Sequence, residues 1–263
     1  MTAEVGAARA EAGKRVRLTD VSMALGRHPR ADAGSVSVKE LLATMDGMGI
    51  ATAVVSSLAS RWHAPAAGNR ELVELLAGVD RLRPCWTVLP DTCGEIGTAA
   101  EFVDQAGEAG VVAVRAFPAD HRYTLDGPDL DDLHGELVRA RLPLLVEASQ
   151  TSWEAVEVVA TRFGEHTLVV GDVGYRSLRS VAGVLSRCPN VYLDLSHLAS
   201  HCGLEWLVER FGPGRFLFGT GWPLRDPAEA VTRLLWSELD DAAVRQIGSG
   251  NARDLFGPDT EEP

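Results

Sequence analysis

Short apolar runs recur along the chain, and each is followed by a stretch in which apolar residues return at helical spacing. The runs are rich in β-branched and aliphatic residues and end in small or polar ones, which is typical of strands buried on both faces. Their starts are separated by roughly 24 to 35 residues, the length of a strand, a loop and a crossover helix. The predicted strands are residues 16–22, 51–57, 82–89, 111–117, 142–148, 167–172, 191–196 and 215–220.

The segments between these runs carry helix start and stop signals. Ser37 and Glu40 form an S-x-x-E pattern ahead of an apolar stretch, and Thr151 and Glu154 repeat the spacing, so we predict a capping box at each place. Other helices are predicted to begin near residues 69, 129 and 176. Gly49 follows the first helical stretch, where a glycine C-cap is common.

Eight strand-then-helix units in about 250 residues have the dimension of a (β/α)8 TIM barrel. We therefore predict an α/β fold with one barrel domain over residues 16–257. A disordered or loosely packed leader (1–15) and a frayed tail (258–263) are expected to flank it. No glycine-rich dinucleotide or P-loop motif follows the first strand, so a nucleotide site has no support in the sequence.

Composition and charge narrow the class of partner. The chain has 263 residues, 46% of them hydrophobic and 24% charged, which is the balance of a globular protein. Its 25 Lys and Arg against 37 Asp and Glu give a net charge of −12, which repels phosphate backbones and anionic lipids. We expect a cytoplasmic protein without nucleic-acid or membrane partners. The four cysteines form no C-x-x-C motif, and we expect reduced thiols and no structural zinc.

Candidate chemistry lies at the strand ends, because barrel enzymes place reactive groups there. Glu147 and Asp172 end the fifth and sixth predicted strands on the inward parity, and such a carboxylate pair can raise one pKa and divide the acid and base roles. The open alternative is neutralisation by Arg115 or by backbone donors. Arg115 can equally hold a substrate carboxylate. His197, after the seventh strand, is a candidate acid or base, or else a helix cap.

Aromatic and imidazole side chains near the same ends are candidate substrate contacts. His121 and Tyr123 lie in the loop after the fourth strand, where a lid over the pocket is natural, although any exposed loop can carry such residues. Trp86 and Trp222 end the third and eighth strands and can stack on a planar substrate or simply pack the barrel rim. Tyr175 follows the sixth strand.

The order of these segments resembles a known family. NVYLDLS, FGPGRFLFGTGWP and GSGNARDLFG, within residues 191–256, are similar to the C-terminal third of the amidohydrolase-related (amidohydrolase 2) proteins of the metal-dependent hydrolase superfamily. Upstream, GVVAVRAFPADHRYTLDGPDLDDL, LPLLVEAS and LVVGDVGY resemble the family's fourth, fifth and sixth strands. The resemblance implies a barrel, hydrolysis of C–N or lactone bonds or decarboxylation, and a homodimer.

The sequence departs from that family at the metal ligands. Members that use a metal carry H-x-H at the first strand, a histidine at the fifth and at the sixth, and an aspartate at the eighth. The corresponding residues here are Ser22 and Ala24, then Glu147, Asp172 and Gly221. The resemblance therefore implies no metal and no other cofactor.

Three hypotheses follow. The first is a metal-independent enzyme that acts on a small carboxylated or carbonyl-bearing metabolite by proton transfers among Glu147, Asp172 and His197, in a hydrolysis, decarboxylation, or lyase, isomerase or cyclase reaction. The second is a catalytically inactive barrel that binds a metabolite or a protein partner. The weakest is a relocated Mn, Fe or Mg site formed by both carboxylates with a histidine such as His28 or His197.

Overall fold

The computed structural model describes residues 16–29 and 34–258. The leader expected over residues 1–15 and all but the first residue of the tail expected over 258–263 lie outside the described residues. Within the described part, no helix is both long and apolar enough to cross a membrane. Cys85 and Cys188 are buried free thiols, and Cys93 and Cys202 are exposed ones.

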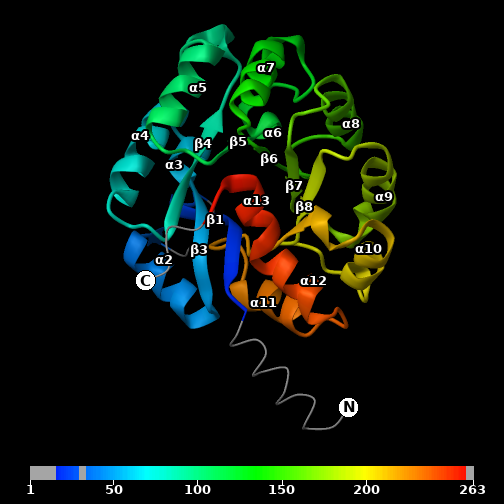
Figure 1. The fold of residues 1–263 in the computed structure, drawn as a ribbon. Coiled ribbons are helices and arrows are strands. Elements are labelled where there is room, and N and C mark those ends of the chain that lie inside the picture. Colours follow the sequence, from blue (N-terminus) through cyan, green and yellow to red (C-terminus); the bar gives the residue numbers. More distant parts are fainter. Residues whose placement is uncertain (1–15, 30–33, 259–263) are drawn as a thin grey trace.

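Eight parallel strands are paired in the order β1-β3-β4-β5-β6-β7-β8-β9. Figure 1 shows the strands curling around a common centre. The two ends of the sheet meet where the Val21 amide donates to the Phe218 carbonyl at 3.0 Å. A ninth, two-residue strand pairs antiparallel with β1. The strands are β1 (Leu18–Arg27), β2 (Ser35–Val36), β3 (Ile50–Ser57), β4 (Leu82–Val88), β5 (Ala113–Ala116), β6 (Leu144–Glu147), β7 (Leu168–Gly171), β8 (Val191–Asp194) and β9 (Phe216–Leu217).

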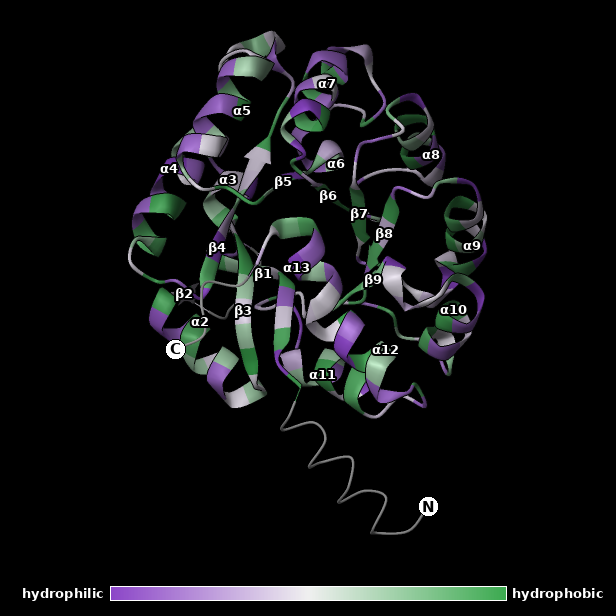
Figure 2. Cartoon of the chain, viewed as in Figure 1, coloured by the Kyte–Doolittle hydropathy of each residue, from purple (hydrophilic) through white to green (hydrophobic). Residues whose placement is uncertain are grey.

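Helices form the outer layer around this barrel (Figure 1). In Figure 2 they carry hydrophobic and hydrophilic residues in alternation, whereas β3 and β8 are mostly hydrophobic, because strands covered on both faces contact no water. The helices are α2 (Val38–Met48), α3 (Leu58–Trp62), α4 (Pro65–Leu76), α5 (Ala99–Glu108), α6 (Pro118–His121), α7 (Asp131–Ala140), α8 (Trp153–Arg162), α9 (Leu178–Arg187), α10 (Gly203–Phe211), α11 (Pro227–Leu235), α12 (Asp241–Arg245) and α13 (Asn251–Phe256).

The barrel interior has its own small core. It is lined by one inward residue from each of seven strands, and α13, at the centre of the ring of strands in Figure 1, adds two more. Arg83, near the start of β4, donates to the carbonyls of Phe256 and Gly257, which fixes α13 at the amino-terminal end of the barrel. The members of this inner core are Val21, Val54, Cys85, Ala113, Leu145, Val169, Leu217, Ala252 and Phe256. The carboxyl ends of the strands lie at the opposite end of the barrel, which α13 does not fill.

The predicted fold is confirmed, with local corrections. All eight predicted strands form, but β2 was not predicted, because two residues are too short for a periodic signal. Ser37 and Glu40 make the predicted capping box, and Gly49 ends α2 in the left-handed conformation. The second predicted box, at Thr151, is wrong by one position: Ser152 is the N-cap, and its side chain accepts a hydrogen bond from the backbone N–H of Ala155.

Candidate active site

The open end of the barrel narrows to a small mouth. A cavity of about 40 Å³ lies there, close to the share of one water molecule in the liquid, roughly 30 Å³. It therefore has room for a small group such as a carboxylate. Its lining combines two arginines and a glutamate with small and apolar residues, namely Ser22, Met23, Ala24, Ser56, Ser57, Leu58, Arg61, Arg115, Phe117, Glu147, Gly221, Trp222 and Leu224.

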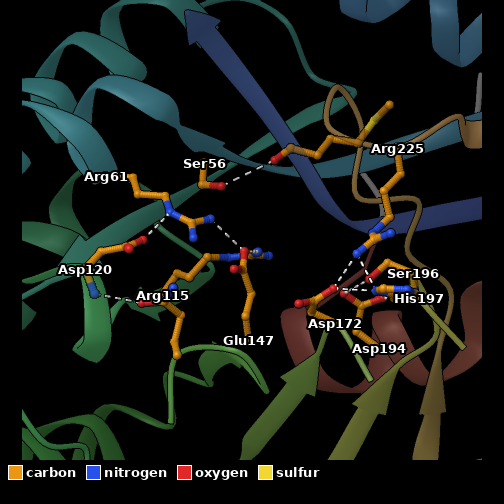
Figure 3. Close-up of polar contacts among 12 residues, drawn as sticks. Ser56, Arg61, Arg115, Asp120, Glu147, Asp172, Asp194, Ser196, His197 and Arg225 are labelled. Carbon is orange, nitrogen blue, oxygen red and sulfur yellow. Dashed lines mark hydrogen bonds and ion pairs between the residues drawn. The ribbon is translucent and has the colours of Figure 1, made fainter. Parts of the chain in front are cut away.

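Glu147 sits between two guanidinium groups at this mouth. Arg61 Nη1 lies 3.0 Å and Arg115 Nη1 3.8 Å from Glu147 Oε1. Arg61, on α3, also donates through Nε to Asp120 at 2.8 Å, as Figure 3 shows. The side chains of Arg61 and Arg115 are each only 9% exposed, and burial strengthens ion pairs because water screens them less. Glu147 is therefore ion-paired chiefly with Arg61, which the sequence did not name as its partner, and at longer range with Arg115, which it did.

Asp172 anchors a second cluster on the next strand. It follows β7 in the left-handed conformation (φ 56°), which is unusual for a residue with a side chain. Its Oδ1 lies 2.7 Å from Nδ1 of His197 and 2.5 Å from Nη2 of Arg225. Arg225 Nη2 also contacts Nδ1 of His197 (Figure 3). Aspartate, imidazole and guanidinium thus converge on a single carboxylate oxygen.

The pKa of Asp172 shows that this carboxylate is not the member of the predicted pair with a raised pKa. Burial alone would raise the pKa of Asp172, but hydrogen bonds from His197, Arg225 and Ser149 outweigh burial, and the pKa is lowered. Asp172 is therefore a carboxylate held ionised, suited to orient an imidazole and not to donate a proton.

Two carboxylates with raised pKa values do exist, inside the barrel next to the mouth. Burial raises the pKa of Asp20 to about 7, against hydrogen bonds from Thr220 and Ser22. Burial also raises the pKa of Asp194, opposed chiefly by the charge of Arg115. Both are fully buried, and the charge of Asp194 adds to the shift at Asp20. Raised carboxyl pKa values are thus found at Asp20 and Asp194, and burial is their main cause.

The position of Asp194 depends on two glycines of the neighbouring strands. A Cβ at Gly219 would lie 2.1 Å from Asp194 Oδ1, and one at Gly171 would lie 2.8 Å from Oδ2. Neither approach leaves room for a side chain, so these glycines form the slot that holds the carboxylate. Ser196 fastens it further, since its N–H donates to Oδ1 at 2.8 Å.

The predicted aromatic contacts separate into different places. Trp222 lines the mouth, as predicted. Trp86 lies on the outer face of β4, where its ring packs 5.7 Å from that of Phe102, and it lines a separate cavity of about 230 Å³ in the helix layer. Tyr175 is 57% exposed and contacts Arg176.

His121 and Tyr123 line a neighbouring cavity of about 390 Å³ formed by the loops after β4 and β5. His121 Nε2 lies 2.7 Å from the carbonyl of Arg61, and the Tyr123 hydroxyl donates to the carbonyl of Val88 at 3.3 Å. His121 is therefore tied to the backbone of a mouth arginine from outside, and neither side chain is among those that line the mouth itself.

Arg225 and Asp20 are site residues that sequence reasoning did not select, and Arg61 and Asp194, which the sequence places in a predicted loop and at a predicted strand end where candidates are sought, received no role from it. Arg61 and Arg225 lie in a helix and a loop, and nothing in their spacing distinguishes them from the other arginines of the chain. Asp20 and Asp194 carried a usable signal, because each is an acidic residue inside a predicted buried strand, where an unpartnered charge would be costly.

Comparison with known proteins places the chain in a family. The profile of the amidohydrolase family matches residues 17–257, and the chain belongs to this family. No curated protein matches at a significant level.

Solved structures match over nearly the whole chain. An uncharacterised TIM-barrel protein from Bordetella bronchiseptica is 18% identical, with a TM-score of 0.75 over 91% of this chain and 98% of that one. A dihydroxybenzoic acid decarboxylase from Polaromonas sp. JS666, solved with manganese and the inhibitor 2-nitroresorcinol, is 15% identical (TM-score 0.77; 92% and 97%). A putative 2-pyrone-4,6-dicarboxylic acid hydrolase from Pseudomonas putida is 16% identical (TM-score 0.71; 94% and 99%). At such identities the matches show the fold.

The residues at the mouth do not fit a manganese ion. Divalent ions of this kind need several oxygen or nitrogen ligands on one centre. Among the residues that the structure describes, no group of three or more His, Cys, Asp or Glu could hold a metal. Glu147 and Asp172 instead face guanidinium groups, and His28, a candidate for a relocated site, packs edge-on against Trp62.

Proposed function

We propose that this member of the amidohydrolase family is an enzyme that acts on a small carboxylate by proton transfer at His197. The observation that carries the proposal is the 2.7 Å contact between His197 Nδ1 and Asp172 Oδ1. When Nδ1–H donates to the carboxylate of Asp172, Arg225 Nη2 donates to that carboxylate and not to Nδ1. The imidazole is then fixed in orientation, and Nε2 is the atom left to take or give a proton. The side chain of His197 is 35% exposed, so a substrate can reach it.

The arginines of the mouth support a carboxylate as the substrate's anchoring group. Planar guanidinium groups bind carboxylates with paired hydrogen bonds. Arg115 Nε has no acceptor within the described part of the chain. The cavity accepts a carboxylate-sized group beside Arg61 and Arg115, while Trp222 and Leu224 give apolar area for a ring. Relatives named for aromatic and pyrone acids support a ring carboxylate.

Decarboxylation is the reaction that suits this set of residues best. A proton passes from His197 Nε2 to the ring carbon that bears the carboxylate, the electrons of the breaking C–C bond return to the ring, and CO₂ leaves. Solvent then restores the proton on His197. This reaction needs an oriented substrate carboxylate and one proton donor, and it needs no water activated by a metal. Lactone hydrolysis would need such a water.

A binding protein without turnover is the second candidate. It is favoured by Glu147, which the sequence predicted to be catalytic and whose carboxylate has two cationic neighbours, Arg61 and Arg115. A carboxylate compensated in this way is suited to fixing the arginines in place, which a barrel that only binds a ligand also requires.

One assay separates the two candidates. Chelator-treated protein is incubated with 2,6-dihydroxybenzoate, 5-carboxyvanillate and 2-pyrone-4,6-dicarboxylate, and the release of CO₂ and the ultraviolet spectrum are followed. We expect CO₂ release by the wild type and its loss in His197→Gln. Saturable binding without any turnover would favour the second candidate, and turnover that appears only on adding Mn²⁺ would contradict the metal-independent reaction.

A further inference from the structure

In the loop after β9, the aliphatic part of the Arg225 side chain lies next to Gly221. Gly221 is in the left-handed conformation (φ +71°), and a Cβ built on it would lie 3.2 Å from Arg225 Cδ and 3.5 Å from Ser196 Cβ. A contact of 3.2 Å is closer than ordinary packing, so a side chain at position 221 would require Arg225 to shift by a few tenths of an ångström. The missing side chain of Gly221 therefore favours the present course of Arg225 past this loop.

The guanidinium at the end of that stem meets both polar groups of the second cluster. Arg225 Nη2 lies 2.5 Å from Asp172 Oδ1 and contacts His197 Nδ1. Asp172 Oδ1 and His197 Nδ1 are atoms of the kinds that bind divalent ions, and both contact this guanidinium. An arginine side chain stays charged at all physiological pH values, so the cation at this position is permanent.

We propose that the guanidinium of Arg225 is the resident cation of this site and that it keeps a divalent ion off Asp172 and His197. It supplies the positive charge at the carboxylate and occupies the approach to Nδ1 of the imidazole. A divalent ion would have to displace it, separate the pair with Asp172 and bear the repulsion of a like charge at close range. The proposal goes beyond the proposed function and does not depend on it, because it concerns metal binding without substrate.

The same geometry explains how a barrel of this family can carry an arginine side chain as the cation of the site in place of a metal ion. The Polaromonas decarboxylase was solved with manganese. In this chain the carboxylate at β6 is held by Arg61 and Arg115 and the one after β7 by Arg225. Glu147 and Asp172 are thus each ion-paired with arginine side chains of the protein itself, so a positive charge is held next to both carboxylates without a metal ion.

The test measures Mn²⁺ binding to the full chain by titration, with the electron paramagnetic resonance signal of free Mn²⁺ as readout. The variants are Arg225→Ala, Arg225→Gln and the double variant Arg225→Ala with Asp172→Asn. Arg176→Ala is the matched control, because Arg176 is an exposed arginine in the loop after β7. Circular dichroism confirms that each variant is folded, and Arg225→Gln keeps a polar side chain if the alanine variant does not fold.

We expect Mn²⁺ affinity to rise about tenfold or more when the guanidinium is removed, since one displaced charge pair is worth about that factor. The double variant should lose the gain, and the Arg176 control should bind as weakly as the wild type. Tight one-to-one Mn²⁺ binding by the wild type would overturn the proposal. So would folded Arg225 variants that gain no affinity. Neither result bears on whether His197 is needed for turnover, so the two proposals fail separately.

Discussion

Glu147 and Asp172 end neighbouring strands, yet the structure gives them different partners. Glu147 faces two buried arginines, Arg61 and Arg115. Asp172 faces an imidazole and a single, more exposed guanidinium, and it lies in a strained left-handed turn. The comparison teaches that a carboxylate's role is set by its partners: cations on both sides make an anchor, and an imidazole partner makes an orienting group for proton transfer.

The largest expected effect separates these two roles in catalysis. His197→Gln removes the group proposed to exchange the proton and should lower kcat by about 10³-fold, within the range for general acid or base catalysts. Glu147→Gln should leave kcat nearly unchanged and raise KM by about tenfold, as expected when the grip on an anion is loosened. Steady-state kinetics on the decarboxylation substrate checks both. A kcat loss in Glu147→Gln as large as that in His197→Gln would return the proton-transfer role to Glu147.

The next largest effect is expected when an arginine of either cluster is removed and the free energy of unfolding is measured. Arg115→Met removes a buried charge next to Glu147 and the buried Asp194, and should lower the free energy of unfolding by about 3 to 5 kcal/mol. Arg225→Met affects a side chain that is 30% exposed, so water compensates part of the loss, and about 1 kcal/mol is expected. Urea unfolding measures both. Equal losses would show that the two clusters do not differ in burial energetics.

The buried histidine His166 extends the comparison to the pH dependence of stability. His166 is 1% exposed, and neither ring nitrogen has a hydrogen-bond partner within the described residues. Burial lowers the pKa of His166 to about 3. Because the unfolded chain protonates near pH 6.5 and the folded one does not, stability should fall as pH drops from about 6.5 to 3, by at most about 1.4 kcal/mol per pH unit.

His166→Phe should remove that slope, as measured by urea unfolding across this pH range. His63, an exposed histidine, supplies the matched control, and His63→Phe should keep the slope. An unchanged slope in His166→Phe would mean that the acid sensitivity arises elsewhere.

Asp20 should give a smaller dependence of opposite sign, because its hydrogen bonds offset part of the burial cost. Its pKa is raised from 3.8 to about 7, so its contribution to stability is present below pH 3.8 and is lost as pH rises towards 7. Asp20→Asn should flatten this part of the profile. A variant that instead becomes more sensitive to rising pH would show that Asp20 is ionised at low pH in the folded protein.

The smallest effect is expected at a surface pair, which sets the baseline for the others. Arg81 Nη1 lies 2.7 Å from Asp46 Oδ1, but the two side chains are 40% and 65% exposed. Asp46→Asn should change the free energy of unfolding by less than about 1 kcal/mol. A larger loss would mean that distance alone, and not burial, decides the strength of the ion pairs in this chain.

The barrel and the positions of its candidate site residues follow from the amino-acid sequence alone. Apolar runs at regular spacing require strands covered on both sides, and strand ends follow directly from where those runs stop. Glu147, Asp172 and His197 were found in this way, because each stands at the end of a run. The Ser37 capping box was equally readable, since it depends on residues three positions apart.

The partners of those residues, in contrast, could be found only in the folded chain. Arg61 reaches Glu147 across 86 positions of sequence, and Arg225 reaches Asp172 across 53. A long, flexible arginine side chain in a helix or loop leaves no periodic trace of its target, so neither pairing could be read from spacing. The same holds for Asp20 and Asp194, whose raised pKa values come from burial inside a closed barrel. Local pattern fixes where a side chain starts, whereas charge, burial and protonation depend on distant parts of the chain that folding brings together.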